Sequence, residues 1–155
     1  MDDAMMGNGM ATLSPALFLR EAEVRRGIEL LFAAQAELAR AIAPLLARAE
    51  LGQAHYRALA AIGRTPNLTV GALRLALRLT KQSLHRTLTE LVARDLVEVR
   101  IGRDDRRQRL LRLTEAGRAL DAELFELLRQ RMATAYAQAG QQAVGGYWAV
   151  LSGLD

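Results

Sequence analysis

An apolar repeat with a period of seven residues runs along the first third of the chain. Its members are Leu17, Val24, Leu31, Leu38 and Leu45. This spacing predicts a helix from Leu17 to about Arg48 whose apolar face packs along another helix. Ser14 and Pro15 offer an N-cap and a first-turn proline, and Pro44 is expected to bend or loosen the last turns.

Three short helices are predicted in the middle of the chain. The first runs from about Gln53 to Ile62, and Gly63 follows as a stop. The second starts at the cap Thr69, and the third at the cap Thr80. In the third helix the apolar residues at i, i+4 and i+7 must face the core: Leu84, Leu88 and Leu91. The side chains left on its outer faces are Lys81, Gln82, Ser83, His85, Arg86 and Thr89.

A β-hairpin is predicted directly after these helices. Strand-like runs at 96–101 and 109–113 flank the turn sequence GRDDRRQ. A hairpin in this position is a wing, and the guanidinium groups at its tip can bond phosphates or enter a minor groove. The cations of the tip are Arg103, Arg106 and Arg107. Asp104 and Asp105 lie between them and are expected to orient the arginines.

Two more helices are predicted at the end of the chain. Thr114 caps a long helix that reaches about Ala139, and Gly140 ends it before a last, aromatic-containing helix. One chain offers too few packing partners to bury the apolar faces of the terminal helices, so we expect these helices to pair with a second copy. The expected dimer contacts include Leu17, Val24, Leu31, Leu124, Leu128, Trp148 and Leu151. Tyr136, Tyr147 and Trp148 could instead line a ligand cavity, but a dimer core is favoured.

Composition supports a mostly α fold with a small β-wing. Of the 155 residues 51% are apolar, chiefly Ala and Leu, while aromatics make up only 5%. We expect a winged helix-turn-helix lobe at 51–113, a flexible tail at 1–13, an N-terminal dimerisation helix at 14–50 and C-terminal dimerisation helices at 114–155. Residues 74–109 hold ten Lys and Arg against five Asp and Glu, an excess of five positive charges that suits a polyanionic partner.

Several chemistries are disfavoured by what the sequence lacks. It has no cysteine, and its two histidines, His55 and His85, have no metal-ligand partner at suitable spacing. His55 suggests a packed or surface histidine at a helix junction, and His85 a position on the DNA face. No catalytic triad, phosphate loop or dinucleotide fingerprint is visible, so we expect a non-enzyme without a cofactor. We expect no signal peptide and no membrane span, which favours the cytoplasm.

Two functions fit this pattern. One is a DNA-binding transcriptional regulator, whose recognition helix carries Thr80, Lys81, Gln82, Ser83, His85 and Arg86 and whose wing carries Arg103, Asp105, Arg106 and Arg107. The other is a helical adaptor that keeps the winged fold without reading bases. The outward Lys81, Gln82, Ser83 and Arg86 favour the regulator.

The segment from Leu51 to Leu120 resembles the MarR family of bacterial regulators, named for multiple antibiotic resistance. The resemblance rests on HYRALAAI, on LTVGALRLALRLTKQSLHRTLTELVARDLVEVR and on the wing-to-helix string DRRQRLLRLTEAG. In that string five residues stand at the positions expected for the family: Asp105, Arg107, Leu113, Thr114 and Gly117. Arg74 and Arg78 depart from it, since less charge is common there.

The resemblance implies a homodimer with intertwined termini and one winged lobe on each subunit. It implies that Arg107, held by Asp105, contacts a minor groove and that the outer face of the helix from Thr80 contacts a major groove. The expected function is a repressor that binds a pseudo-palindromic double-stranded DNA operator. A small apolar or aromatic effector is expected to release it.

Overall fold

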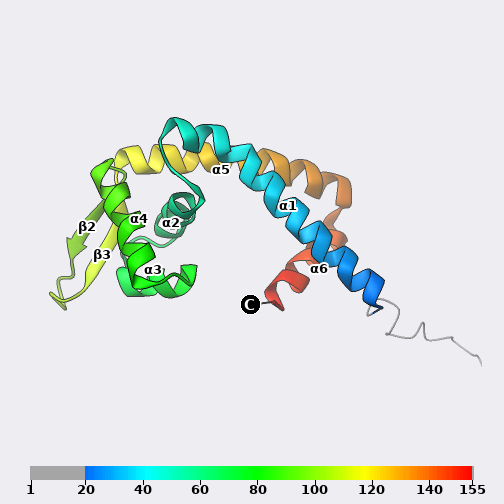
Figure 1. The fold of residues 1–155 in the computed structure, drawn as a ribbon, viewed down its shortest axis with the longest axis horizontal. Helices are drawn as coiled ribbons and strands as arrows, with labels where there is room; N and C mark the ends of the chain where they lie inside the picture. The colour runs from blue at the N-terminus through cyan, green and yellow to red at the C-terminus, as the bar shows by residue number, and fades with distance from the viewer. Residues whose placement is uncertain (1–19, 155) are drawn as a thin grey trace, which may run out of the picture. The chain divides into compact units, whose positions relative to one another are not determined.

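The computed structural model describes residues 20–154 and contains six α-helices and three short strands in this range (Figure 1). The elements are α1 (Glu21–Arg48), α2 (Gln53–Arg64), β1 (Leu68–Thr69), α3 (Val70–Leu77), α4 (Lys81–Ala93), β2 (Val97–Ile101), β3 (Arg109–Leu113), α5 (Glu115–Ala139) and α6 (Gln141–Ser152). Among the described residues, 38–154 form one compact unit and 20–37 belong to another. The mostly α fold with a small β-wing is confirmed. The expected cap at Ser14 and the contact at Leu17 lie outside the described residues.

Helix α1 is more apolar than the sequence interpretation allowed. An 18-residue window of this helix has a mean hydropathy of 1.4, so its length and composition alone would let it cross a membrane. The helix passes this composition test because Ala and Leu outweigh the scattered charges, although charged residues interrupt every apolar run in it. The helix continues through Pro44, and Ile42, Leu45 and Leu46 in its last turns are buried. Only 17% of the apolar window is buried, so most of α1 exposes its apolar side chains.

The core of the compact unit forms where α2 contacts α3, α4, α5 and the sheet. Each helix contributes the apolar residues that its sequence period placed on one face. The large side chains with almost no exposure include Leu59, Ile62, Leu73, Leu84, Leu91, Leu111 and Leu124. Because α2 lies at the centre of these contacts, it sets the position of α4 relative to the rest of the unit.

The sheet has three antiparallel strands in the order β1-β3-β2. β2 and β3 form the expected hairpin, in which Val99 pairs with Leu111. Sequence patterning missed β1, whose two residues pair with the other edge of β3 through Leu68 and Leu111. A strand this short carries no alternating pattern of its own. β1 nevertheless ties the start of α3 to the base of the wing.

Three threonines cap helices as the sequence predicted. The side chain of Thr69 accepts the N–H of Ala72 at the start of α3, and Thr80 accepts the N–H of Ser83 at the start of α4. The turn between these helices begins at Arg78, whose φ of 52° ends α3 in the left-handed conformation. Gly63, expected to follow α2, lies inside its last turn.

The first turn of α5 packs directly against the segment between α4 and β2. The hydroxyl of Thr114 donates to the carbonyl of Asp95 at 2.6 Å and accepts the N–H of Gly117 at 2.9 Å. The N–H of Thr114 donates to the carbonyl of Leu96 at 3.1 Å. A Cβ on Gly117 would lie 2.0 Å from that same carbonyl oxygen, so only glycine fits without a backbone shift.

We predict that Gly117→Ala destabilises the protein by at least about 2 kcal/mol, because overpacking against a backbone oxygen cannot be relieved by a rotamer change. The melting temperature of the variant should be lower than that of the wild type by roughly 4–8 °C when the two are compared at the same protein concentration. Gly71→Ala in α3 is the matched control, since a Cβ there meets nothing within 4 Å. An unchanged melting temperature for Gly117→Ala would contradict the close approach.

Candidate nucleic-acid interface

Helix α4 presents a polar outer surface because its apolar residues are used in the core. Thr80 fixes its first turn through the N–H of Ser83, and the Thr80 hydroxyl also donates to Ser83 Oγ at 2.9 Å. Thr80 therefore acts as the helix cap. The residues predicted to face outward are all exposed: Lys81, Gln82, Ser83, His85, Arg86 and Thr89.

The outer surface of α4 is divided into two rows at helical spacing. One row contains Lys81, His85, Thr89 and Val92, and it borders a groove of about 1050 Å³ between α4, the start of α3 and the wing strands. The other row contains Gln82, Arg86 and Glu90. Helical periodicity predicted the outward position of these side chains except Val92 and Glu90.

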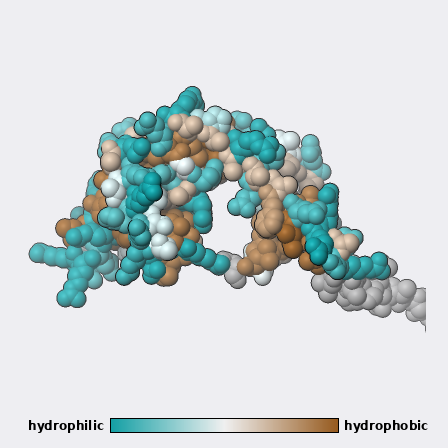
Figure 2. Space-filling view, viewed as in Figure 1, coloured by the Kyte–Doolittle hydropathy of each residue, from teal (hydrophilic) through white to brown (hydrophobic). Residues whose placement is uncertain are grey.

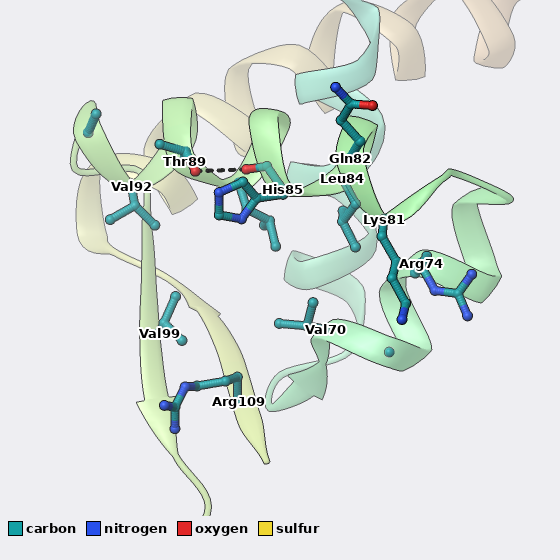
Figure 3. Close-up of a pocket in the computed structure, with 13 residues that line it drawn as sticks. Val70, Arg74, Lys81, Gln82, Leu84, His85, Thr89, Val92, Val99 and Arg109 are labelled. Atoms are coloured by element: carbon teal, nitrogen blue, oxygen red, sulfur yellow. Dashed lines mark hydrogen bonds between the residues drawn. The ribbon is translucent and has the colours of Figure 1, made fainter. Parts of the chain in front are cut away.

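The groove has an apolar floor and a cationic rim (Figure 3). Val70 on α3, Leu84 and Val92 on α4, and Val99 on β2 contribute apolar surface. The rim carries Arg74 and Lys81 close together at one end and Arg109 on the wing strand. Sequence reasoning missed Arg74 and Arg109 as parts of this face, because β1 and the strand pairing that bring them beside α4 are not local in sequence.

The wing tip is a narrow turn with exposed cations. Arg103, Arg106 and Arg107 are all exposed, and the tip is hydrophilic in Figure 2. Asp105 Oδ1 accepts the backbone N–H of Arg107 at 2.9 Å, and the carbonyl of Asp105 accepts the N–H of Gln108 at 3.0 Å. Asp105 thus orders the backbone that carries Arg107, through the local side-chain bond typical of Asx turns.

A hydrogen-bonded cluster joins α2 to α4. Glu90 accepts from Arg86 Nε at 3.1 Å through Oε1 and lies 2.5 Å from His55 Nε2 through Oε2. His55 Nδ1 accepts the N–H of Gly52 at 3.0 Å, so the ring proton must be on Nε2, which donates to Glu90. The hydrogen bonds from Arg86 and, next, His55 lower the pKa of Glu90, which keeps this carboxylate charged at neutral pH.

The residues expected at the dimer contact have different environments. Val24 and Leu31 on α1 and Trp148 on α6 are exposed, while Leu128 and Leu151 are half-buried. Leu124 is 0% exposed within its own chain, so it belongs to the core of the subunit and cannot contact a partner. Its burial follows from the packing of α5 on α2, which periodicity along α5 alone does not reveal.

An exposed aromatic cluster joins α5 to α6. Trp148 Nε1 donates to the hydroxyl of Tyr136 at 3.1 Å, and the rings of Tyr147 and Trp148 both pack edge-on against Tyr136. No residue of α6 is buried in the described chain, and hydrophobic surface is visible where this helix lies in Figure 2. Over residues 20–154, no group of three or more His, Cys, Asp or Glu is arranged to hold a metal ion.

Comparison with known proteins agrees with this geometry. The model of the MarR family matches residues 50–108. The HTH-type transcriptional regulator PetP of Rhodobacter capsulatus is 45% identical over 138 residues, which span 89% of this chain and 83% of PetP. NadR in complex with 4-hydroxyphenylacetate has a TM-score of 0.71 at 23% identity, covering 80% of this chain and 88% of its own.

A MarR variant from E. coli in complex with operator DNA shares the fold with a TM-score of 0.65 at 22% identity. The match covers 89% of this chain and 97% of that one. The fold of this chain is therefore shared with solved structures of regulators. The chain belongs to the MarR family of winged-helix, DNA-binding transcription regulators.

Proposed function

We propose that this protein is a repressor that binds a pseudo-palindromic DNA operator as a homodimer in the cytoplasm. The observation that carries the proposal is the coincidence, on one lobe, of the polar outer face of α4 and the cationic wing tip. The excess of five positive charges lies within the segment that forms these two elements. A basic lobe of this kind gains affinity from every phosphate that it neutralises.

Helix α4 is suited to reading bases in the major groove. Gln82 and Arg86 have the amide and guanidinium groups that make bidentate contacts with adenine and guanine edges. Both are exposed and lie one turn apart on the same row of the helix. Lys81 and His85, on the adjacent row, are suited to phosphate contacts.

An adaptor that keeps the winged fold without reading bases is the alternative. Such a protein would have no need for cations at the tip of a narrow hairpin, where their side chains cannot contribute to packing. The exposed guanidinium groups of Arg103, Arg106 and Arg107 therefore favour the DNA-binding function.

A second copy of this chain is the partner that best fits the exposed apolar surface of the terminal helices. The exposed apolar or aromatic side chains include Val24, Ile28, Leu31 and Phe32 on α1, Phe125 on α5, and Trp148 and Val150 on α6. A lipid bilayer is a poorer partner, because Glu29, Glu37 and Arg40 would place charges in the hydrocarbon region. A symmetric dimer also places two α4 helices on one side of a DNA duplex.

A small apolar or aromatic effector would act by changing the spacing of these two helices. NadR binds 4-hydroxyphenylacetate in its solved structure, so an aromatic carboxylate is the first class to consider. The candidate cavity here has a volume of about 430 Å³ and lies between the end of α1 and α5. Arg48 could pair with a carboxylate, while Glu123 and Glu126 in the same lining would favour an uncharged aromatic ligand. Since the two helices must stay about one DNA turn apart, a small rotation would lower affinity.

We expect Arg107→Ala to weaken operator binding and to reduce the slope of log affinity against log salt by about 1, because one cation is lost from the interface. Titration of labelled operator at several salt concentrations measures both quantities. Arg129→Ala is the control, since Arg129 lies on α5 in an ion pair with Glu126. Unchanged affinity and slope for Arg107→Ala would show that the wing does not engage DNA.

Asp105→Ala should also weaken binding, although it removes a negative charge from a surface that faces DNA. The reason is that the wing turn loses the acceptor for the Arg107 N–H. Asp105→Asn keeps an acceptor oxygen and should bind at least as well as the wild type in the same titration. Tighter binding by Asp105→Ala would mean that the carboxylate acts only by repulsion.

The purified protein should sediment as a dimer and protect a site of about 16 to 20 base pairs with two half-sites. Val150→Glu, at a side chain that is 67% exposed on α6, should shift the protein toward monomer and abolish the two-half-site footprint. Leu75→Glu, at a side chain that is 69% exposed on α3, is the matched control for sedimentation alone and should remain dimeric. A monomer that protects a single half-site would rule out the proposed dimer.

A further inference from the structure

The acidic side chain of Glu90 is unexpected on the reading surface of α4. It shares a row with Gln82 and Arg86, and a carboxylate there repels the phosphates that the surrounding cations attract. Helix stability does not account for it, because an Arg that precedes a Glu by four residues is the weaker order for such a pair. The side chains of Arg86 and Glu90 are 83% and 34% exposed, which makes their ion pair weak as a source of stability.

Glu90 is nevertheless fixed in position from the other side. His55 is only 14% exposed, and its Nε2 lies 2.5 Å from Glu90 Oε2. The ring is itself held by the N–H of Gly52 at the start of α2, through Nδ1. Thus α2, which lies at the centre of the core, fixes the carboxylate, and the carboxylate holds Arg86 at Nε.

This arrangement restricts what Arg86 can do. A long cationic side chain without a partner can move to the nearest phosphate, which carries no sequence information. An Arg whose Nε is bonded to a fixed carboxylate has fewer orientations and retains its Nη groups for a base edge. The nearby negative charge also lowers the gain from a phosphate contact.

We propose that Glu90, held by His55, is a positioning residue that makes Arg86 a reader of base sequence and prevents it from serving as a general phosphate contact. This inference rests on the proposed function, since it requires α4 to face DNA. Helix α2 would then influence base preference through His55, although His55 does not reach the outer surface of α4.

The test compares Glu90→Gln with the wild type in two measurements: the base preferences of DNA selected from a random pool, and the affinities for operator and unrelated DNA. Arg86→Ala identifies the base pair that depends on Arg86. Glu90→Gln should reduce discrimination at that same base pair by at least about fivefold and raise affinity for unrelated DNA. Glu126→Gln, which removes a carboxylate paired with an arginine on α5, should change neither quantity.

Two substitutions at His55 distinguish a role in positioning Glu90 from a role in folding. Asn places an oxygen near the position of Nδ1, so His55→Asn can keep the bond from Gly52 while losing the donor to Glu90. It should relax the same base preference, whereas His55→Gln, which keeps a donor near Nε2, should retain it. Thermal unfolding of each variant shows that the lobe remains folded.

Wild-type discrimination in both Glu90→Gln and His55→Asn would overturn the inference. If Arg86→Ala changes the selected base while Glu90→Gln does not, Arg86 reads DNA without help and the proposed function stands. If Arg86→Ala leaves all selected bases unchanged, the reading face itself is wrong.

Discussion

The junction at Thr114 is the contact on which the arrangement of the lobe depends. Its hydroxyl and N–H bond the carbonyls of Asp95 and Leu96, and Gly117 allows the first turn of α5 to approach them. The residues 95–96 are also the link between α4 and β2. One short contact therefore fixes the end of the reading helix, the base of the wing and the start of the long helix. The wing and α4 cannot change their relative position unless this junction opens.

The terminal helices are less well packed than this junction, since much of their apolar surface lies outside any core. Val150 and Trp148 on α6 are more than half exposed, and α1 is apolar enough in composition for a membrane. A helix that buries its apolar face against its own lobe needs no further partner. The apolar faces of these helices stabilise the protein only when another surface covers them. The chain thus combines a lobe that has a buried core with terminal helices whose apolar faces are exposed.

Local chemistry explains which features could be predicted from sequence. Thr69, Thr80 and Thr114 were identified as caps because a cap depends on residues within one turn. The bond between His55 and Glu90 spans 35 positions, and β1 is a two-residue strand, so neither leaves a periodic signal. The burial of Leu124 is likewise not evident from the sequence, because α5 has apolar residues on more than one side. Only its packing on α2 shows which side is internal. The spacing of Gln82, Arg86 and Glu90 is visible in the sequence, but the bond that joins Glu90 to His55 is not.

Affinity and base preference can be separated in this lobe because its arginines lie in different surroundings. The arginines of the wing stand on a turn ordered by Asp105, where their side chains are exposed and would respond to the electrostatic potential of any bound duplex. Arg86 lies beside a carboxylate whose position is set by α2. A cation of the first kind adds to the binding of any duplex, whereas a cation of the second kind gains most where a base edge matches its restricted orientation. The junction at Thr114 holds α4 and the wing together, so a movement of α5 would shift both kinds of contact at once. Occupancy of an operator would then change more steeply with the position of α5 than it would if only one kind of contact moved.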